Sequence, residues 1–206
     1  MKNQEIINFN HRISEKDFIR FDYVPEVTNF RNCSGYCFDR ITNVVTGEVF
    51  EEGHDFNTIV GSISSLAAAR FRGGADFQGL QMWAIGSGAS SWDAGWDSNL
   101  PPSTDASSTR LVNEIGRLPL LIAGQDSYMT YVDQNGTPTE GLTNRLKVMR
   151  RFGRNEVNGE WREFALFGGN ANETRGSGIM MNHRIHRVIT KTSDMSIERL
   201  IIFTFH

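Results

Sequence analysis

Apolar and alternating runs dominate the C-terminal part of the chain, from Trp161 to Phe205. Three runs there are rich in β-branched, aromatic and long apolar residues: WREFALFGG, SGIMMNHRIHRVITK and MSIERLIIFTF. The segments between them, GGNANETRGSG and TSD, have the composition of turns. The pattern therefore predicts a sheet of hairpin-linked strands.

The final run is apolar on both faces of the predicted strand. Because strand side chains alternate, Ile201, Phe203 and Phe205 point to one face. Leu200 and Ile202 point to the other. Such a strand is either central in a sandwich or buried on its second face against another copy of the chain, and the pattern leaves both alternatives open.

Further short runs precede these at spacings of roughly ten residues. They are LPLLIAG, SYMTYVD and NRLKVMRRF, and turn signals such as Asn135-Gly136 and Asn158-Gly159 lie between the predicted strands. Regular short strands with such turns predict a mainly β protein. We expect an antiparallel β-sandwich, jelly-roll-like, with one covering α-helix and an N-terminal extension.

The covering helix is expected in DFNTIVGSISSLAAARFR, which lies N-terminal to these runs. Ile59, Ile63, Leu66 and Ala67 there recur at helical spacing, and Asp55 or Asn57 can cap the start. The glycine pair after this segment ends the helix. Its expected role is to cover an open face of the sheet.

The N-terminal region is polar and weakly patterned. We assign residues 1–53 to an arm or extension with one or two strands, and residues 54–206 to the sandwich. The segment from Trp92 to Pro102 is expected to be irregular, because it holds paired prolines. A short helix is predicted after Asp105.

The chain has 206 residues and a formal net charge of -3, which predicts no general affinity for nucleic acid. One basic stretch, from Arg145 to Arg154, is interpreted as a solvated strand face rather than as a phosphate or sialic-acid site. No run of about 18 apolar residues occurs, so no membrane insertion is expected. The N-terminus lacks the apolar core of a secretory signal, which predicts synthesis in a cytoplasm.

Cysteines and histidines offer little chemistry. Cys33 and Cys37 could form half a metal site with histidines, but we interpret them as structural or free thiols. His183 and His186 have metal-pair spacing only in a helix. In a strand they point to opposite faces, and we expect them to be exposed. We predict no metal, no cofactor and no catalytic residue.

Two Trp-Asp pairs form the sharpest candidate for a binding surface: Trp92-Asp93 and Trp96-Asp97. Aromatic rings stack on sugars and carboxylates bind hydroxyls, so this loop could contact a cell-surface glycan. Tryptophans also anchor loops to a core or to a neighbouring subunit, which is the interpretation we favour.

Several stretches in this order resemble a β-rich structural domain of tailed-bacteriophage virion proteins. The resemblance spans about residues 55 to 206, from the helix segment through MWAIGSG and PPSTDASSTRLVNEIGR to the three closing runs. Ala165 departs from the family pattern, which has glycine there. The positions that fit the pattern are Gly86, Gly88, Thr104, Asp105, Leu111, Glu114, Glu163, Leu166, Phe167, Gly178, Met180, Asn182, Lys191 and Phe203.

The resemblance implies a role in building a virion, as a tail, collar, neck or fibre-associated protein. We expect a homo-oligomer, trimer or ring, that docks to other virion proteins and has no enzymatic activity. The alternative is a receptor-binding module that recognises a host glycan. The candidate contacts are Trp92, Asp93, Trp96, Asp97, Leu200, Ile202, Phe203 and Phe205.

Overall fold

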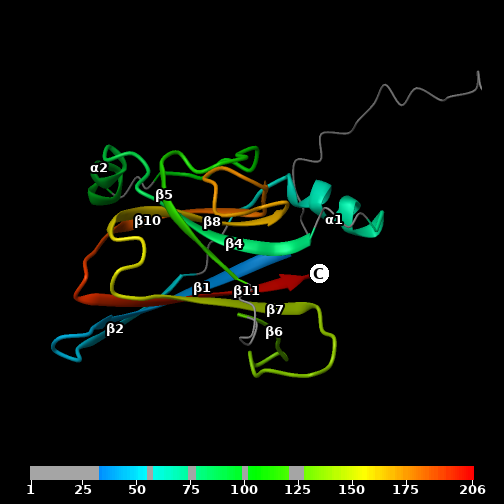
Figure 1. Ribbon diagram of the computed structural model, residues 1–206, viewed down its shortest axis with the longest axis horizontal. Helices are drawn as coiled ribbons and strands as arrows, with labels where there is room; N and C mark the ends of the chain where they lie inside the picture. The colour runs from blue at the N-terminus through cyan, green and yellow to red at the C-terminus, as the bar shows by residue number, and fades with distance from the viewer. Residues whose placement is uncertain (1–32, 55–57, 74–77, 99–101, 121–127) are drawn as a thin grey trace, which may run out of the picture.

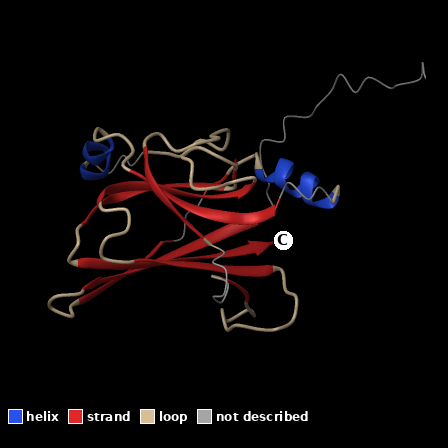
Figure 2. Cartoon of the chain, in the orientation of Figure 1, coloured by secondary structure: helices blue, strands red, loops and turns tan. Residues whose placement is uncertain are grey.

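The computed structural model describes residues 33–54, 58–73, 78–98, 102–120 and 128–206. Its strands form two antiparallel sheets that lie face to face (Figure 1). Helices lie at the margins of these layers (Figure 2). The predicted mainly β, antiparallel sandwich with a covering helix is confirmed. The part of the expected arm before Cys33 lies outside the described residues.

One layer, sheet 1, contains β1 (Cys33–Asn43), β2 (Val49–His54), β6 (Met129–Tyr131), β7 (Arg145–Phe152) and β11 (Met195–Phe205). The strand order is β2–β1–β11–β7–β6. Strand β1 pairs with β11 along its whole length. Residues 33–53, which we assigned to an arm, therefore belong to the sandwich, and the expected boundary falls within β2. Local pattern could not show this, because the pairing joins the two ends of the described chain.

The other layer, sheet 2, contains β3 (Thr58–Ile59), β4 (Gln78–Gly86), β5 (Glu114–Pro119), β8 (Gly159–Gly169), β9 (Ile179–Met180) and β10 (Asn182–Lys191). The strand order is β3–β10–β8–β4–β5, and β9 also pairs with β8. Strand β10 is irregular between Ile185 and Ile189, where residues 186–188 bulge out of the pairing with β8.

The covering helix α1 (Ile63–Phe71) is shorter than predicted. Ile63 and Leu66 are buried, as their spacing indicated, and the helix contacts β4, β8 and β9. Ile59, which we expected in the same stripe, lies in β3 instead. Gly73 follows its last turn with a φ of 75°, in the left-handed region, so a glycine ends the helix as expected. The predicted caps, Asp55 and Asn57, lie outside the described residues, and Ser62 occupies the N-cap position instead.

The segment around the tryptophan pairs differs from prediction. Trp92–Asp97 forms a short helix, α2, where we expected irregular chain. The helix predicted after Asp105 is absent from residues 105–113, which form turns, bends and irregular chain. The physical reason is that Val112 and Asn113 donate their backbone N–H groups to the Glu163 carboxylate, so these groups are not available to a helix.

The closing strand β11 lies between β1 and β7, which makes it central in sheet 1. Phe203 is fully buried and faces the core with Ile201, while Phe205 is half-buried on the same face. Phe203 is thus a core residue, and Phe205 packs partly against the core. Leu200 and Ile202 point outward and stay half-exposed.

Neighbouring strands add apolar side chains to this outward face. Leu200 lies between Phe38 of β1 and Met149 of β7, and Ile202 lies beside Tyr36, which is 43% exposed. We call these five residues the outer apolar patch. Charged residues border it in the next row of the sheet, where Glu198 pairs with Arg40 on one side and Arg151 on the other.

Aromatic side chains fill the space between the sheets. Trp83 and Phe164 from sheet 2 contact each other at a ring-centroid distance of 5.7 Å, and Phe152 from sheet 1 lies 4.9 Å from Trp161. All four are fully buried. Such edge and tilted contacts add to the free energy gained from the buried area itself.

A charged network crosses this core. Asp39 on β1 accepts hydrogen bonds from Nε and Nη2 of Arg199 on β11, at 2.6 and 2.5 Å. Both side chains are 1% exposed. The guanidinium also lies 4.4 Å from the ring centroid of Phe164. From the opposite sheet, His186 approaches Arg199 Nη1 with its Nε2 at 3.3 Å.

The hydrogen bonds fix the tautomer of His186. Its Nδ1 lies 2.7 Å from the carbonyl oxygen of Arg187, which can only accept, so Nδ1 carries the proton. Nε2 then accepts from Arg199. Burial, with the positive charge of Arg199, lowers the pKa of His186 to about 3.

The basic stretch of β7 is only partly solvated, contrary to our interpretation. Arg151 is exposed, but Arg150 faces the core and is 6% exposed. Its guanidinium packs 4.7 Å from the ring centroid of Tyr128 and donates to the hydroxyl of that residue at 2.9 Å. Strand alternation places neighbouring basic residues in opposite environments.

Removing the Asp39 carboxylate leaves Arg199 charged and buried without its partner. We expect Asp39→Ala to lower the free energy of unfolding by about 3–5 kcal/mol, measured by urea denaturation. The matched control is Glu51→Ala, which removes the half-exposed Arg40–Glu51 pair (3.1 Å) and is expected to cost less than about 1 kcal/mol. Similar small losses for both variants would contradict the role of the buried pair.

The neutral His186 makes stability depend on pH. Its pKa is lower in the folded than in the unfolded state, so its contribution is full above about pH 6.5 and is lost as the pH falls toward 3. As the pH falls from 7 to 5, we expect this group to lower the free energy of unfolding by about 2 kcal/mol. Urea midpoints measured across this range should vary less in His186→Gln. The control His206→Gln, at an exposed position, should keep the dependence of the wild type.

Candidate functional site

Helix α2 is fastened to sheet 2 by its first Trp-Asp pair. A Cβ on Gly88 would lie 2.1 Å from the indole of Trp92, so the ring packs directly on this glycine, whose φ is +54°. Asp93 accepts hydrogen bonds from Nε and Nη2 of Arg162 at 2.9 and 2.8 Å. These bonds hold the pKa of Asp93 below its usual value. Trp92 and Asp93 thus anchor the loop within the chain.

The second pair is placed differently. The backbone carbonyl of Trp96 accepts from Nη2 of Arg187 at 3.0 Å, and that guanidinium lies 5.6 Å from the indole centroid. The indole Nε1 is buried and makes no hydrogen bond with the described residues. The side chain of Asp97 lies outside the described part of the chain. The structure therefore brings Trp92, Asp93 and Trp96 together beside sheet 2. The candidate contacts of the closing strand belong to sheet 1 instead.

Glu163 is the centre of a second buried network, on the face of sheet 2 that points away from the core. The carboxylate is fully buried and accepts from the backbone N–H groups of Val112 and Asn113, at 3.1 and 2.9 Å. His183 Nε2 lies 2.9 Å from Oε2. A Cβ on Gly86 would lie 2.5 Å from Oε1, so the carboxylate occupies the space that a side chain would need.

His183 is buried in this network, at 3% exposure, rather than exposed as we expected. Its partner is an acceptor-only carboxylate, so Nε2 donates, and in the neutral imidazole Nδ1 carries a lone pair. Nδ1 is buried and has no hydrogen-bond partner among the described residues. His186 faces the other side of the strand, toward Arg199, so the prediction of opposite faces holds.

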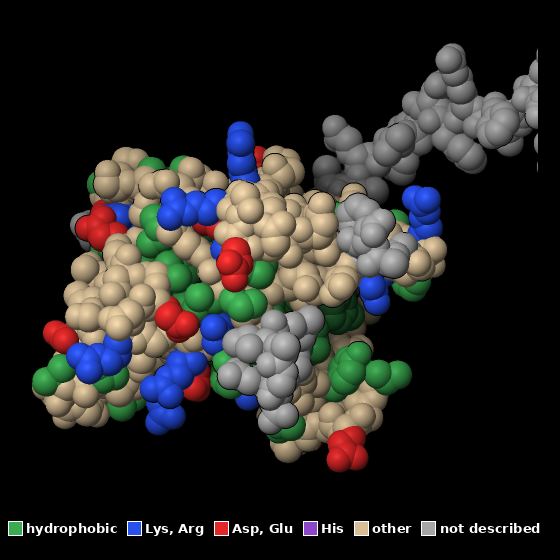
Figure 3. Space-filling view, viewed as in Figure 1, with side chains coloured by type: hydrophobic (Ala, Val, Ile, Leu, Met, Phe, Trp, Pro, Cys, Tyr) green, Lys and Arg blue, Asp and Glu red, His purple; other side chains and the backbone are tan. Residues whose placement is uncertain are grey.

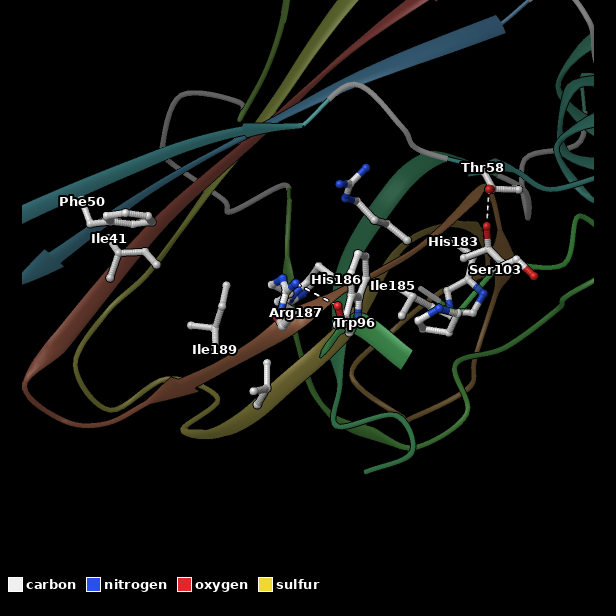
Figure 4. Close-up of a pocket in the computed structure, with 14 residues that line it drawn as sticks. Ile41, Phe50, Thr58, Trp96, Ser103, His183, Ile185, His186, Arg187 and Ile189 are labelled. Atoms are coloured by element: carbon white, nitrogen blue, oxygen red, sulfur yellow. Dashed lines mark hydrogen bonds between the residues drawn. The ribbon is translucent and has the colours of Figure 1, made fainter. Parts of the chain in front are cut away.

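A cavity of about 860 Å³ lies along β10 (Figure 4). Its lining includes Trp96, Ser103, His183, Ile185, Arg187 and Ile189, together with apolar residues from β1 and β2. In Figure 4, Phe50 and Ile41 lie at one end and His183 and Ser103 at the other. The cavity thus joins the Trp96 region to the buried histidine, which sequence reasoning had kept apart.

The two cysteines lie on the inward face of β1 and are free thiols, in agreement with our interpretation. Burial raises the pKa of the Cys33 thiol to about 11, so this sulfur is not a ready nucleophile or metal ligand. Within the described residues, no group of three or more His, Cys, Asp or Glu side chains could hold a metal ion. No helix in that part of the chain is long and apolar enough to cross a membrane.

Acidic and basic side chains are interspersed on the face of the molecule in Figure 3.

Comparison of the chain with protein-family models, with curated proteins and with solved structures gave no match.

Sequence reasoning missed the importance of Glu163 and His183 as a pair. One signal was present, because Glu163 directly precedes the apolar run FALF in a predicted strand, and a buried carboxylate needs donors. The donors come from residues 112 and 113, about fifty positions away, and only the fold reveals them.

Gly86→Ala tests the network around Glu163. The added methyl would meet the carboxylate at 2.5 Å and the Asn113 carbonyl oxygen at 2.9 Å, so we expect a loss of about 1–3 kcal/mol in the free energy of unfolding. Gly79→Ala on the same strand is the control, since a Cβ there meets no atom within 4 Å. Equal effects in thermal or urea unfolding would argue against tight packing at Gly86.

Proposed function

We propose that the protein is a non-enzymatic structural component of a tailed-phage particle, in a tail, collar, neck or fibre-associated position. It works by self-assembly and by docking to other virion proteins. The observation that carries the proposal is the outer apolar patch on sheet 1. The ordered motifs described above supply the link to virion proteins.

The patch has the layout of an association surface. Leu200 and Ile202 occupy the centre of three paired strands and are flanked by Phe38, Met149 and Tyr36. The charged row that contains Glu198 forms one border, and Lys147 and Arg145 stand on the other. An apolar centre with a charged border is the usual anatomy of a protein interface. A face that meets its own copy by two-fold symmetry would bury both centres at once.

Several motif positions have structural roles in this chain, as room for a neighbouring side chain or as hydrogen-bond partners. Gly86 and Gly88 make room for Glu163 and Trp92. Asn182, fully buried, accepts the backbone N–H of Leu166 through Oδ1 at 2.9 Å. Lys191 donates to the Gly153 carbonyl at 2.7 Å and to Asn158 Oδ1 at 2.6 Å, and so holds a turn. These roles support a scaffold rather than a catalyst.

The alternative function, a glycan-binding module, is favoured by one observation, the Trp96 indole in the wall of the cavity. The first pair supports it less, because Asp93 is held by Arg162 and Trp92 packs on Gly88. A glycan would therefore contact Trp96 and the cavity, and not the four residues of both Trp-Asp pairs together.

The mass of the protein in solution tests the proposal. Light scattering after size exclusion, at two concentrations, should give a discrete oligomer for the wild type. Leu200→Lys with Ile202→Lys should shift it toward monomer, with at least a roughly tenfold rise in the dissociation constant. Leu142→Lys, at a residue 86% exposed outside the patch, is the control and should leave the mass unchanged.

A monomeric wild type at both concentrations would contradict self-assembly through this patch. An oligomer that survives the double substitution, with the near-ultraviolet circular dichroism of the folded protein retained, would place the interface elsewhere.

A further inference from the structure

Lys191, the last residue of β10, is a buried amine that the assembly proposal does not use. It is 2% exposed, and its Nζ lies 2.6 Å from Oδ1 of Asn158 and 2.7 Å from the carbonyl oxygen of Gly153. A longer contact of 3.4 Å joins Nζ to the carbonyl oxygen of Arg154. All three partners are neutral oxygens, so the lysine meets an amide side chain and no described carboxylate binds Nζ directly.

These surroundings favour the uncharged amine. Burial lowers the pKa of Lys191, and the negative charge of Glu156 opposes this shift without cancelling it. A lysine that has lost its proton carries a lone pair on Nζ, which makes it a nucleophile. The carboxamide of Asn158 is the electrophile beside it, because Cγ is bonded to the same Oδ1 that Nζ contacts.

The fold holds both groups in place. Lys191 pairs with Gly159 in the ladder between β10 and β8, so the residue before that glycine lies beside the lysine. Val157 has a φ of +49°, which is rare for a β-branched residue, and its carbonyl oxygen accepts from Nε1 of the buried Trp161 at 2.7 Å. Strained backbone that its surroundings hold in place clusters at functional sites. Two groups fixed in contact also react much faster than free groups.

Glu156 supplies a proton acceptor at the same turn. Its Oε2 accepts the backbone N–H of Gly153 at 2.7 Å, and the carbonyl oxygen of the same glycine binds Nζ of Lys191. The carboxylate is close enough to act on the lysine electrostatically. A carboxylate near a reacting amine can take its proton and return it to the leaving group.

We propose that Lys191 and Asn158 form an intramolecular isopeptide bond. The neutral Nζ attacks Cγ of Asn158, so that the Nζ–Cγ bond forms and the Cγ–Nδ2 bond breaks. One proton of the amine passes by way of Glu156 to Nδ2, which leaves as ammonia. The step is an exchange of one amide for another and needs no oxidant or reductant. Because Asn158 is exposed, the ammonia escapes to solvent.

The bond joins β10 to the turn between β7 and β8, two places 33 positions apart in the chain. A covalent link of this kind stabilises a fold in the way a disulfide does, by restricting the unfolded chain. It does not involve the outer apolar patch, so it forms whether or not the chain associates with itself.

Mass spectrometry of the purified full chain tests this proposal. The intact wild type should be lighter than its sequence by one molecule of ammonia. Trypsin should fail to cut after Lys191, and residues 155–162 should be recovered covalently joined to residues 188–199. Lys191→Arg keeps the positive charge without a reactive amine, and this variant and Asn158→Ala should each have the full mass of their sequences. Lys147→Arg, at the other lysine of the described chain, is the matched control and should keep the loss.

A competing reaction gives the same change in mass. An asparagine before a glycine also loses ammonia when the following backbone nitrogen attacks its side chain, and Asn158 precedes Gly159. A loss that persists in Lys191→Arg, with the two tryptic segments recovered separately, would therefore overturn the proposal. A wild type that keeps its full mass after prolonged incubation would overturn it as well. The joined peptide is sought in the wild type itself, so a variant that fails to fold leaves the test valid.

Discussion

The ion pair between Asp39 and Arg199 is the constraint on which the sandwich depends. A charge pair without access to water is stable only if its hydrogen bonds are made, and here Asp39 takes two of them while His186 takes a third from the opposite sheet. The pair also selects the register of β1 on β11. A slip of one residue would turn Arg199 outward and leave the Asp39 carboxylate buried alone, which costs far more than the loss of any single apolar contact.

Glu163 plays the corresponding part on the other face of sheet 2. Its carboxylate accepts hydrogen bonds from the backbone of residues 112 and 113 and contacts the imidazole of His183. The loop before β5 and strand β10 are thus both joined to β8 at this one group. Gly86 must be a glycine for this arrangement, because the carboxylate occupies the position of a side chain. The outer layer of sheet 2 is thus fixed by polar contacts as well as by a small second apolar cluster that includes Leu111, Phe167 and Met180.

How much of this was accessible from the sequence depends on the range of the interaction. The alternation of β11 and the glycine after α1 are local signals, and both predicted the structure correctly. The place of β1 in sheet 1 was missed because its partner lies about 160 residues away in the chain, as the Asp39–Arg199 contact shows. His183 was expected to be exposed because imidazole is polar, and its burial follows only from the hydrogen bond to the Glu163 carboxylate on the neighbouring strand. The cavity on β10 could not be predicted from the sequence for the same reason, since its walls come from both sheets and from α2.

The two sheets differ in how their outward faces are covered, and this difference connects fold and function. Sheet 2 is covered by the chain itself, because Leu111 and Ala171 pack on the outward side chains of β4 and β8. Sheet 1 keeps Tyr36, Phe38 and Leu200 at least partly exposed on its outward face. An apolar sheet face is stable when another layer covers it, so the layer missing from sheet 1 within the described chain is the one that a second molecule would supply. Association through that face would complete the layering and leave β10, with its cavity, uncovered.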